Sequence, residues 1–151
     1  MSLPAIVPNL ISLARQAAGA DSAGLWLLTA DRDALKNVFS DGLPDGYVGC
    51  VKQTPLGKMT CGRAAVDLKP HVCSDMLVDP DFKGVDCSPI RACFSVPVIG
   101  ISGDIHGTLA CHFKETRSPS PYDIERNVIF AQLIAFALDE SKSGHEEAPG
   151  S

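Results

Sequence analysis

Cysteine thiols are the side chains in this chain with the widest chemical potential. A thiolate can act as a nucleophile, bind a soft metal ion or form a reversible disulfide. The six cysteines are Cys50, Cys61, Cys73, Cys87, Cys93 and Cys111. Their spacing contains no C-x-x-C pair and no cysteines that combine with a closely spaced histidine pair, so it does not indicate a structural zinc site. With no secretion signal at the N-terminus, we expect reduced thiols, most of them buried as small apolar residues.

Two histidines lie close to cysteines in the sequence. His71 and Cys73 fall on one face of an expected strand, where they could form half of a metal site or lie at a sheet edge near solvent. Cys111 and His112 are adjacent, and neighbouring strand residues point to opposite faces. His112 is therefore either a hydrogen-bonding group of a pocket or a partly buried histidine with a satisfied partner. No metal ligand set and no cofactor follows from these positions, although a haem ligand from His71, His106 or His112 stays open.

Two strands, 91–99 and 105–113, must position most of these side chains, and residues 100–104 join them in a tight hairpin. Alternation gives the pair two unlike faces. One face is small or polar, with Cys93, Ser95, Thr108, Ala110 and His112. The other is bulky and apolar, with Phe94, Val96, Val98, Leu109 and Phe113. The expected strand 22–29 could add Trp26 to the small face as an aromatic wall.

The remaining elements follow from periodicity and from helix start and stop residues. A helix is expected from Pro8 or Asn9 to Ala18, ended by Gly19, and strands are expected at 22–29, 34–40 and 71–75. Residues 47–57 are interpreted as irregular, 59–68 as a short helix and 78–89 as a loop or a single helical turn. The last helix has Ser120 as N-cap and Pro121 at its first position, and it should end near Ser141.

This order of elements predicts an α+β fold in which an antiparallel sheet carries the N- and C-terminal helices on one face. The segment 41–91 is expected to cover the other face as a lid of loops and short helices. A small polar face under such a lid favours a small-molecule cavity. We expect one domain over residues 1–142 and a disordered tail over 143–151.

Composition excludes several classes of partner and reaction. The chain has 151 residues, 45% of them apolar, and a net charge of -5. It has no block of basic residues to track nucleic acid phosphates and no apolar run of the roughly 18 residues that a membrane span needs. We therefore expect a cytoplasmic protein without nucleic acid or membrane contacts. Phosphate-binding loops, metalloprotease helices and serine hydrolase elbows are absent, so no catalytic residue is predicted from a motif.

Several segments resemble the GAF domain family, over about residues 5–140. They are Gly57–Ala65 (GKMTCGRAA), Val72–Met76 with Asp79–Phe82, Ile90–Val98, Gly107–Ala110 and Arg117–Ser120. The chain is most similar to GAF modules of bacterial signalling proteins, especially two-component sensor histidine kinases. The resemblance implies a PAS-like sheet, a pocket for a small ligand under the lid, and an output kinase domain in the parent protein. It does not specify the ligand or a cofactor.

The resemblance and the strand faces together predict a ligand-binding set. Its members are Trp26, Cys61, Arg91, Cys93, Ser95, Thr108 and His112. Cys61 could be a thiol with a lowered pKa at a helix N-terminus or a small residue buried beneath the lid. Arg91 could hold an anionic ligand or form an ion pair with Asp75 or Asp86.

A second resemblance concerns single-domain enzymes with the same fold. Cys50, Cys61 and Cys87 are similar in order and approximate spacing to the three cysteines of free methionine-(R)-sulfoxide reductases. In that family a thiolate attacks the sulfoxide sulfur and a second thiol resolves the product as a disulfide. The acidic pocket residues of the family correspond here to Cys93, Ala110 and His112, so the groups that would bind the substrate amine and supply a proton are missing.

We therefore predict a sensory GAF module that binds a small ligand or reports redox state. Binding under the lid would shift the terminal helices, which would pass the change to an output domain. The apolar residues of 122–138 cover more than one helix face, which predicts a homodimer through the terminal helices. The sulfoxide reductase is the alternative, and a domain whose pocket is filled and which only dimerises is a third possibility.

Overall fold

The computed structural model describes residues 3–85 and 87–147, with the backbone alone for Cys50 and for residues 143–147. In chain order the elements are α1 (Ile6–Ala18), β1 (Ser22–Leu28), β2 (Ala34–Asp41), α2 (Asp45–Val51), β3 (Gln53–Pro55), α3 (Met59–Asp67), β4 (His71–Cys73), the 3-10 turn η1 (Pro80–Phe82), β5 (Ala92–Ile99), β6 (Ile105–Phe113) and α4 (Pro121–Glu147).

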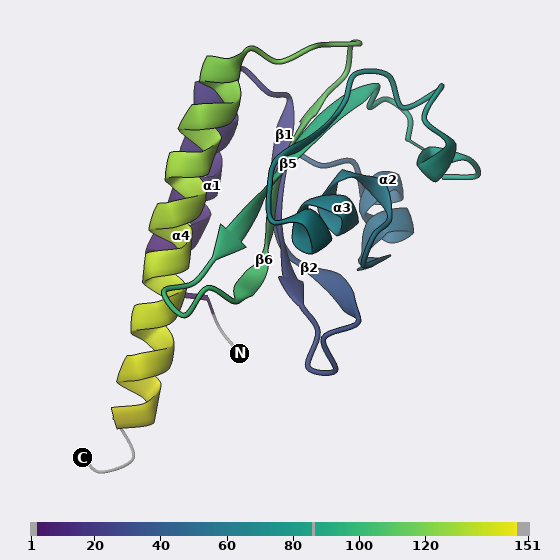
Figure 1. The fold of residues 1–151 in the computed structure, drawn as a ribbon. Helices are drawn as coiled ribbons and strands as arrows, with labels where there is room; N and C mark the ends of the chain where they lie inside the picture. The colour runs from purple at the N-terminus through teal and green to yellow at the C-terminus, as the bar shows by residue number, and fades with distance from the viewer. Residues whose placement is uncertain (1–2, 86, 148–151) are drawn as a thin grey trace.

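The strands form one sheet in the order β3-β2-β1-β6-β5-β4, and every neighbouring pair is antiparallel. Helices α1 and α4 lie side by side on one face of this sheet (Figure 1). Helices α2 and α3 and the loop 76–91 lie on the opposite face, which we call the inner face. The predicted α+β architecture, with terminal helices on one side and a lid on the other, is confirmed.

The face under α1 and α4 holds the larger apolar core. The bulky residues predicted for it, including Phe94, Val96 and Leu109, are fully buried against Ile11 of α1 and Ile134 of α4. Each such side chain contributes about 1.5–3 kcal/mol through its removal from water. This core anchors both terminal helices to the central strands β1, β5 and β6.

Helix α1 begins at Ile6, two or three residues before the predicted start at Pro8 or Asn9. Pro8 lies in the first turn of the helix, where backbone amides have no acceptor within the helix. The proline, which lacks an amide hydrogen, therefore removes no helix hydrogen bond and does not interrupt α1. The predicted stop is confirmed, because Gly19 takes a left-handed φ of 64° and its amide donates to the carbonyls of Arg15 and Gln16.

Helix α4 starts as predicted and ends later than predicted. The Ser120 hydroxyl accepts from the Asp123 amide at 3.2 Å, and the Asp123 carboxylate accepts from the Ser120 amide at 3.0 Å. The helix continues beyond Ser141 to Glu147, so residues 143–147 of the expected tail are helical, while 148–151 lie outside the described residues. Within the described ranges, no helix combines the length and the apolar character required to cross a bilayer.

The lid is more regular than its composition suggests, and the interpretation of 47–57 as irregular is wrong. Helix α2 contains two glycines, Gly46 and Gly49, which lower its intrinsic helix propensity. Its Tyr47 and Val51 lie one turn apart and are buried against the inner face, so tertiary packing stabilises the helix. Strand β3 is only three residues long and pairs with the start of β2, where Leu35 lies opposite Thr54.

Candidate functional site

The register of four strands places a row of buried side chains across the inner face. Ser22 of β1 lies opposite His112 of β6, His112 lies opposite Cys93 of β5, and Cys93 lies opposite Cys73 of β4. The neighbouring pairs Trp26–Thr108 and Ala110–Ser95 point to the same side. The predicted alternation of small polar and bulky apolar residues is therefore confirmed for β5 and β6, and β1 continues both faces.

Helix α3 places one hydroxyl group, of Thr60, and one thiol group, of Cys61, against this row. Thr60 Oγ1 lies 2.8 Å from Ser95 Oγ and 3.3 Å from Cys93 Sγ. Cys61 Sγ lies 3.2 Å from the same Ser95 oxygen. The close approach depends on Gly62, where a Cβ atom would collide with the Pro55 carbonyl oxygen. Sequence reasoning missed Thr60, although its place beside Cys61 in the first turn of the expected helix could have indicated it.

Aromatic rings close the other end of the row. The Trp26 ring lies over Gly24, where a Cβ atom would stand 2.7 Å from it, and its Nε1 donates to the Val51 carbonyl at 2.8 Å. The His112 ring centroid lies 5.9 Å from that of Trp26 and 5.3 Å from that of Tyr47, which meets it edge-on. Tyr47 was not predicted to belong to the site because α2 was not predicted as a helix.

The space between these groups is almost filled, which corrects the prediction of a roomy cavity beside Trp26 and His112. The remaining void has a volume of about 10 Å³, room for one water molecule at most. It is bounded by the rings of Trp26, Tyr47, Phe82 and His112 and by Cys61. Three of these rings reach the void from separate segments, β1, α2 and η1, so their total volume could not be deduced from β5 and β6 alone.

Three polar atoms on the inner face are buried without a hydrogen-bond partner among the described residues. They are Ser22 Oγ, Thr108 Oγ1 and His112 Nδ1. Burial lowers the pKa of His112 to about 3, so its imidazole is neutral at physiological pH. An unpaired buried polar atom costs about 1–3 kcal/mol, and native proteins retain few of them. Polar atoms left in this state are therefore candidates for contact with a bound molecule.

Four cysteines from four segments surround the same region. The pKa of the Tyr47 hydroxyl is raised well above its usual value by burial and by the nearby Cys93, Cys61, Cys87 and Cys73. Of the two interpretations of Cys61, a thiol with a lowered pKa does not fit the structure, because burial raises the pKa of that thiol. Its other interpretation, a small buried residue beneath the lid, is the one observed.

Arg91 does not join the other six predicted residues. Its guanidinium forms a forked contact with the Asp75 carboxylate at 3.1 Å and 3.2 Å, the ion pair that was one of its two predicted roles. Asp86, the other predicted partner, and the side chain of Cys50 lie outside the described part of the chain. His71 Nε2 lies 2.7 Å from Asp67 Oδ2, and the described residues contain no His, Cys, Asp or Glu cluster that could hold a metal ion.

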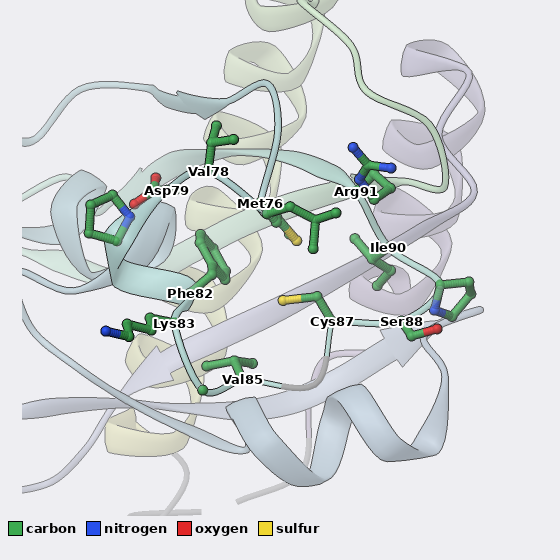
Figure 2. Close-up of a pocket in the computed structure, with 14 residues that line it drawn as sticks. Met76, Val78, Asp79, Phe82, Lys83, Val85, Cys87, Ser88, Ile90 and Arg91 are labelled. Carbon is green, nitrogen blue, oxygen red and sulfur yellow. The ribbon is translucent and has the colours of Figure 1, made fainter.

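Residues of the loop 76–91 line a second and much larger cavity of about 870 Å³, which is partly open to solvent. The loop is closed at its base where the Met76 amide donates to the Arg91 carbonyl at 2.7 Å. In Figure 2 the side chains of Met76, Phe82, Cys87 and Ile90 converge on its interior. Phe82 is 4% exposed and lines both this outer cavity and the small inner void, so its side chain is part of the wall between them.

One carboxylate fastens the loop to α3. Asp81 Oδ2 accepts a hydrogen bond from the Met59 amide at 2.9 Å and lies 2.6 Å from Arg63 Nη2. Burial raises the pKa of Asp81, but the Met59 amide and the Arg63 charge outweigh it and hold that pKa below its usual value. The position of Phe82, the next residue, therefore depends on a contact between the lid and the first turn of α3.

Residues 2–138 match the family model of the GAF domain. No curated protein matches the chain. Solved structures with the same fold include the free methionine-R-sulfoxide reductase of Neisseria meningitidis, in complex with its substrate, at 20% identity and a TM-score of 0.77, covering 91% of this chain and 78% of that one.

Two further structures have similar folds. A domain assigned to a two-component sensor histidine kinase protein of Sinorhizobium meliloti has 13% identity and a TM-score of 0.77, covering 92% of each chain. The GAF-B domain of DevS from Mycobacterium smegmatis has 17% identity and a TM-score of 0.74, covering 95% of this chain and 97% of that one. At these identities the similarity shows the shared fold.

Proposed function

Since the chain belongs to the GAF domain family, we propose that it is a sensory or regulatory module that binds a small molecule or responds to redox state. The observation that carries this proposal is the pair of spaces separated by Phe82: an outer cavity of about 870 Å³ and a buried polar face behind it. A ligand in the outer cavity that displaced the Phe82 ring would gain access to the inner void. His112 borders this void, and its Nδ1 has no hydrogen-bond partner among the described residues.

The sheet provides the path from this site to the terminal helices. Ser95 and Thr108 face the lid, while the adjacent Val96 and Leu109 pack against α1 and α4. A ligand that shifts β5 or β6 from the inner face would therefore also displace the apolar core under α1 and α4, because close-packed interiors transmit displacements. The ligand can act as a signal only if its affinity differs between the two arrangements.

The signalling context is part of the same proposal. We place the domain in a cytoplasmic bacterial protein, with an output kinase domain that receives the shift of α4. The sensor histidine kinase domain of similar fold supports this context.

A homodimer through the terminal helices would suit such a relay. Four apolar side chains of α4 are exposed along one stripe, at spacings of seven, four and three residues: Tyr122, Ile129, Leu133 and Phe136. Helix α1 exposes Ile6 and Leu13 beside α4. Apolar residues at these spacings lie on one helix face, and two such helix pairs can bury each other as a four-helix bundle.

The ligand-binding part can be tested with the apolar anionic dye anilinonaphthalene sulfonate. Trp26 is the only tryptophan of the chain and lies behind Phe82, so dye bound in the outer cavity should accept energy from it. We expect saturable dye binding with quenching of Trp26 emission. Native mass spectrometry of the freshly purified protein should in addition show any small molecule that it retains.

A matched pair of substitutions locates the dye. Val85→Phe introduces bulk on the wall of the outer cavity and should weaken dye binding at least several-fold. Val66→Phe makes the same change at an exposed position of α3 that does not line the cavity and should leave binding unchanged. Equal effects of the two substitutions, or no dye binding at all, would contradict the ligand-binding role and favour a domain that only dimerises.

The sulfoxide reductase is the second candidate, because the Cys87 sulfur points into the outer cavity (Figure 2). Cys61 borders the inner void. The structure of a sulfoxide reductase with a similar fold adds support. Against it, Cys93, Ala110 and His112 offer no carboxylate for a substrate amine, and burial keeps the His112 imidazole neutral.

The two candidate functions differ in whether the chain reduces free methionine sulfoxide catalytically. We expect no consumption of free methionine sulfoxide by the chain with a thiol reductant. Turnover that is lost in both Cys61→Ser and Cys87→Ser, and kept in Cys111→Ser on the helix-covered face, would establish the enzyme instead.

A further inference from the structure

Cys73 and Cys93 face each other directly across two strands. They are register partners in the antiparallel pair β4–β5, and both side chains lie on the inner face. The Cα atoms of directly opposed residues in such a pair are about 4.5–5.5 Å apart. Disulfide-linked cysteines have Cα separations of about 4.4–6.8 Å, so the backbone already holds this pair at a distance that a disulfide can span.

The two sulfur atoms also differ in chemical character. Hydrogen bonding from the Cys93 thiol lowers the pKa of Cys73, outweighing the effects of burial and of the Asp79 carboxylate, which raise it. The same contact and burial raise the pKa of Cys93 well above its usual value. A pair with one thiolate-prone sulfur and one protonated neighbour suits attack on an oxidant followed by resolution.

The position of the pair connects it to the lid. Cys73 is the last residue of β4, the edge strand of the sheet, which has only three paired residues. The chain then continues through Asp75 into the loop 76–91 that lines the outer cavity. Cys93 lies opposite His112 on its other side and contacts Thr60 of α3. A covalent bond here would fasten the base of the loop to the centre of the inner face.

We propose that Cys73 and Cys93 form a reversible cross-strand disulfide when a peroxide oxidises the domain. The proposal rests on the redox part of the proposed function and names the residues and the class of oxidant. It does not depend on Cys50, Cys61 or Cys87.

The reaction balances in two steps. The Cys73 thiolate attacks one oxygen of hydrogen peroxide, the O–O bond breaks, and Cys73 becomes a sulfenic acid while hydroxide leaves and takes a proton to form water. The Cys93 sulfur then attacks the Cys73 sulfur, the S–O bond breaks, and a second water leaves with the proton of Cys93. Two thiols and one peroxide thus give one disulfide and two waters, and an added dithiol reverses the change.

The experiment treats the intact chain with hydrogen peroxide, blocks the remaining thiols by alkylation and maps the tryptic peptides. Cys73 lies on the peptide 64–83, whereas Cys93 shares the peptide 92–114 with Cys111, so fragmentation must distinguish these two. We expect a crosslink between the two peptides, with the loss of two hydrogen atoms, located at Cys93. Addition of dithiothreitol should remove it completely.

Three substitutions separate the roles of the sulfur atoms. Cys93→Ser should leave Cys73 as a sulfenic acid that dimedone traps, and Cys73→Ser should abolish both the crosslink and the dimedone adduct at this site. Cys111→Ser makes the same change on the opposite face, where Cys111 lies among the core residues under α1 and α4, and should retain the crosslink in full.

Absence of the Cys73–Cys93 crosslink in the folded wild-type chain overturns the inference, as does a crosslink of Cys73 to any other cysteine. The readout is separate from that of the ligand role, because dye binding is measured in reduced protein. Loss of dye binding with an intact crosslink would contradict the ligand role alone, and the reverse result would contradict only the disulfide.

Discussion

At the scale of single residues, the inner face is unusual in combining deep burial with polar chemistry. Ser95 and Thr60 satisfy each other, but His112 Nδ1 and Thr108 Oγ1 have no partner among the described residues. A fully apolar lid interior would avoid the cost of these atoms. His112 borders the small inner void, so its unpaired nitrogen links this region to a binding role rather than to stability.

The buried His112 side chain should make the free energy of unfolding depend on pH. Its folded-state pKa is lowered to about 3, against 6.5 for an unperturbed histidine. In the interval between these values the unfolded chain binds a proton that the folded chain does not. The contribution of His112 to stability is therefore fully present above about pH 6.5 and falls by up to about 1.4 kcal/mol for each unit of pH below it.

Urea unfolding at a series of pH values would measure this effect. In His112→Phe, which keeps an aromatic ring and removes the titrating group, the slope between about pH 6 and pH 4 should be shallower than in the wild type by about 1.4 kcal/mol for each pH unit. Carboxylates such as Asp81 and Asp139, whose pKa values are lowered, lose their stabilising contribution only at more acidic pH. Parallel slopes for the two proteins would show that His112 titrates normally when folded.

At the scale of elements, the lid is held by a second apolar cluster on the inner face and by a few specific polar contacts. Helix α3 is placed by the close approach of Gly62 to the Pro55 carbonyl and by hydrogen bonds from its first turn to Ser95. The turn η1 is placed by Asp81, which contacts the amide of Met59 and the guanidinium of Arg63. Ligand-binding loops generally open at lower free energy than the central strands of a sheet, so we expect the lid to be the part of the fold that responds to a ligand.

Asp81→Asn should therefore loosen the lid without unfolding the sheet. The substitution removes the charge that Arg63 and the Met59 amide stabilise, at a cost of about 1–3 kcal/mol. We expect amide hydrogen exchange to rise several-fold in residues 76–85 and 87–91 and to stay unchanged in β6 and α4. Asp104→Asn, in the exposed hairpin between β5 and β6, is the control and should change exchange in neither region. Uniformly faster exchange across the sheet would instead identify Asp81 as a general stabilising residue.

At the scale of the whole molecule, the sheet separates two functions. Its inner face carries the thiols, the hydroxyls and the lid, while the opposite face carries the continuous apolar core under α1 and α4. The outer surface of these helices is itself partly apolar, and Phe136 of α4 is 65% exposed. Apolar side chains aligned on one helix face indicate an interaction surface more strongly than scattered ones do.

The homodimer can be tested by light scattering. We expect twice the chain mass for the wild type and a monomer for Phe136→Glu, because a carboxylate at the centre of an apolar helix interface would be buried without a partner. Ile101→Glu introduces the same charge at a residue that is 95% exposed in the β5–β6 hairpin and should leave the dimer intact. A monomeric wild type, or equal effects of both substitutions, would contradict dimerisation through the terminal helices.

The sequence alone determined the features that depend on neighbours along the chain. Alternation in β5 and β6 placed Cys93, Ser95, Thr108 and His112 on one face, since a strand has a strict period of two. Capping residues located the C-terminal end of α1 and the start of α4 for the same local reason. Segments that resemble the GAF family indicated the architecture, which the family match over residues 2–138 confirms.

Only the tertiary structure decided how space and charge are shared among distant segments. Packing on the sheet makes α2 a helix despite its glycines, and thereby brings Tyr47 against His112 to fill the expected cavity. The larger cavity arises from the path of the loop 76–91, and Arg91 pairs with Asp75 instead of facing the other site residues. Volume and pairing of this kind depend on side chains tens of residues apart, whose separation is set by the whole packed core and not by any local pattern.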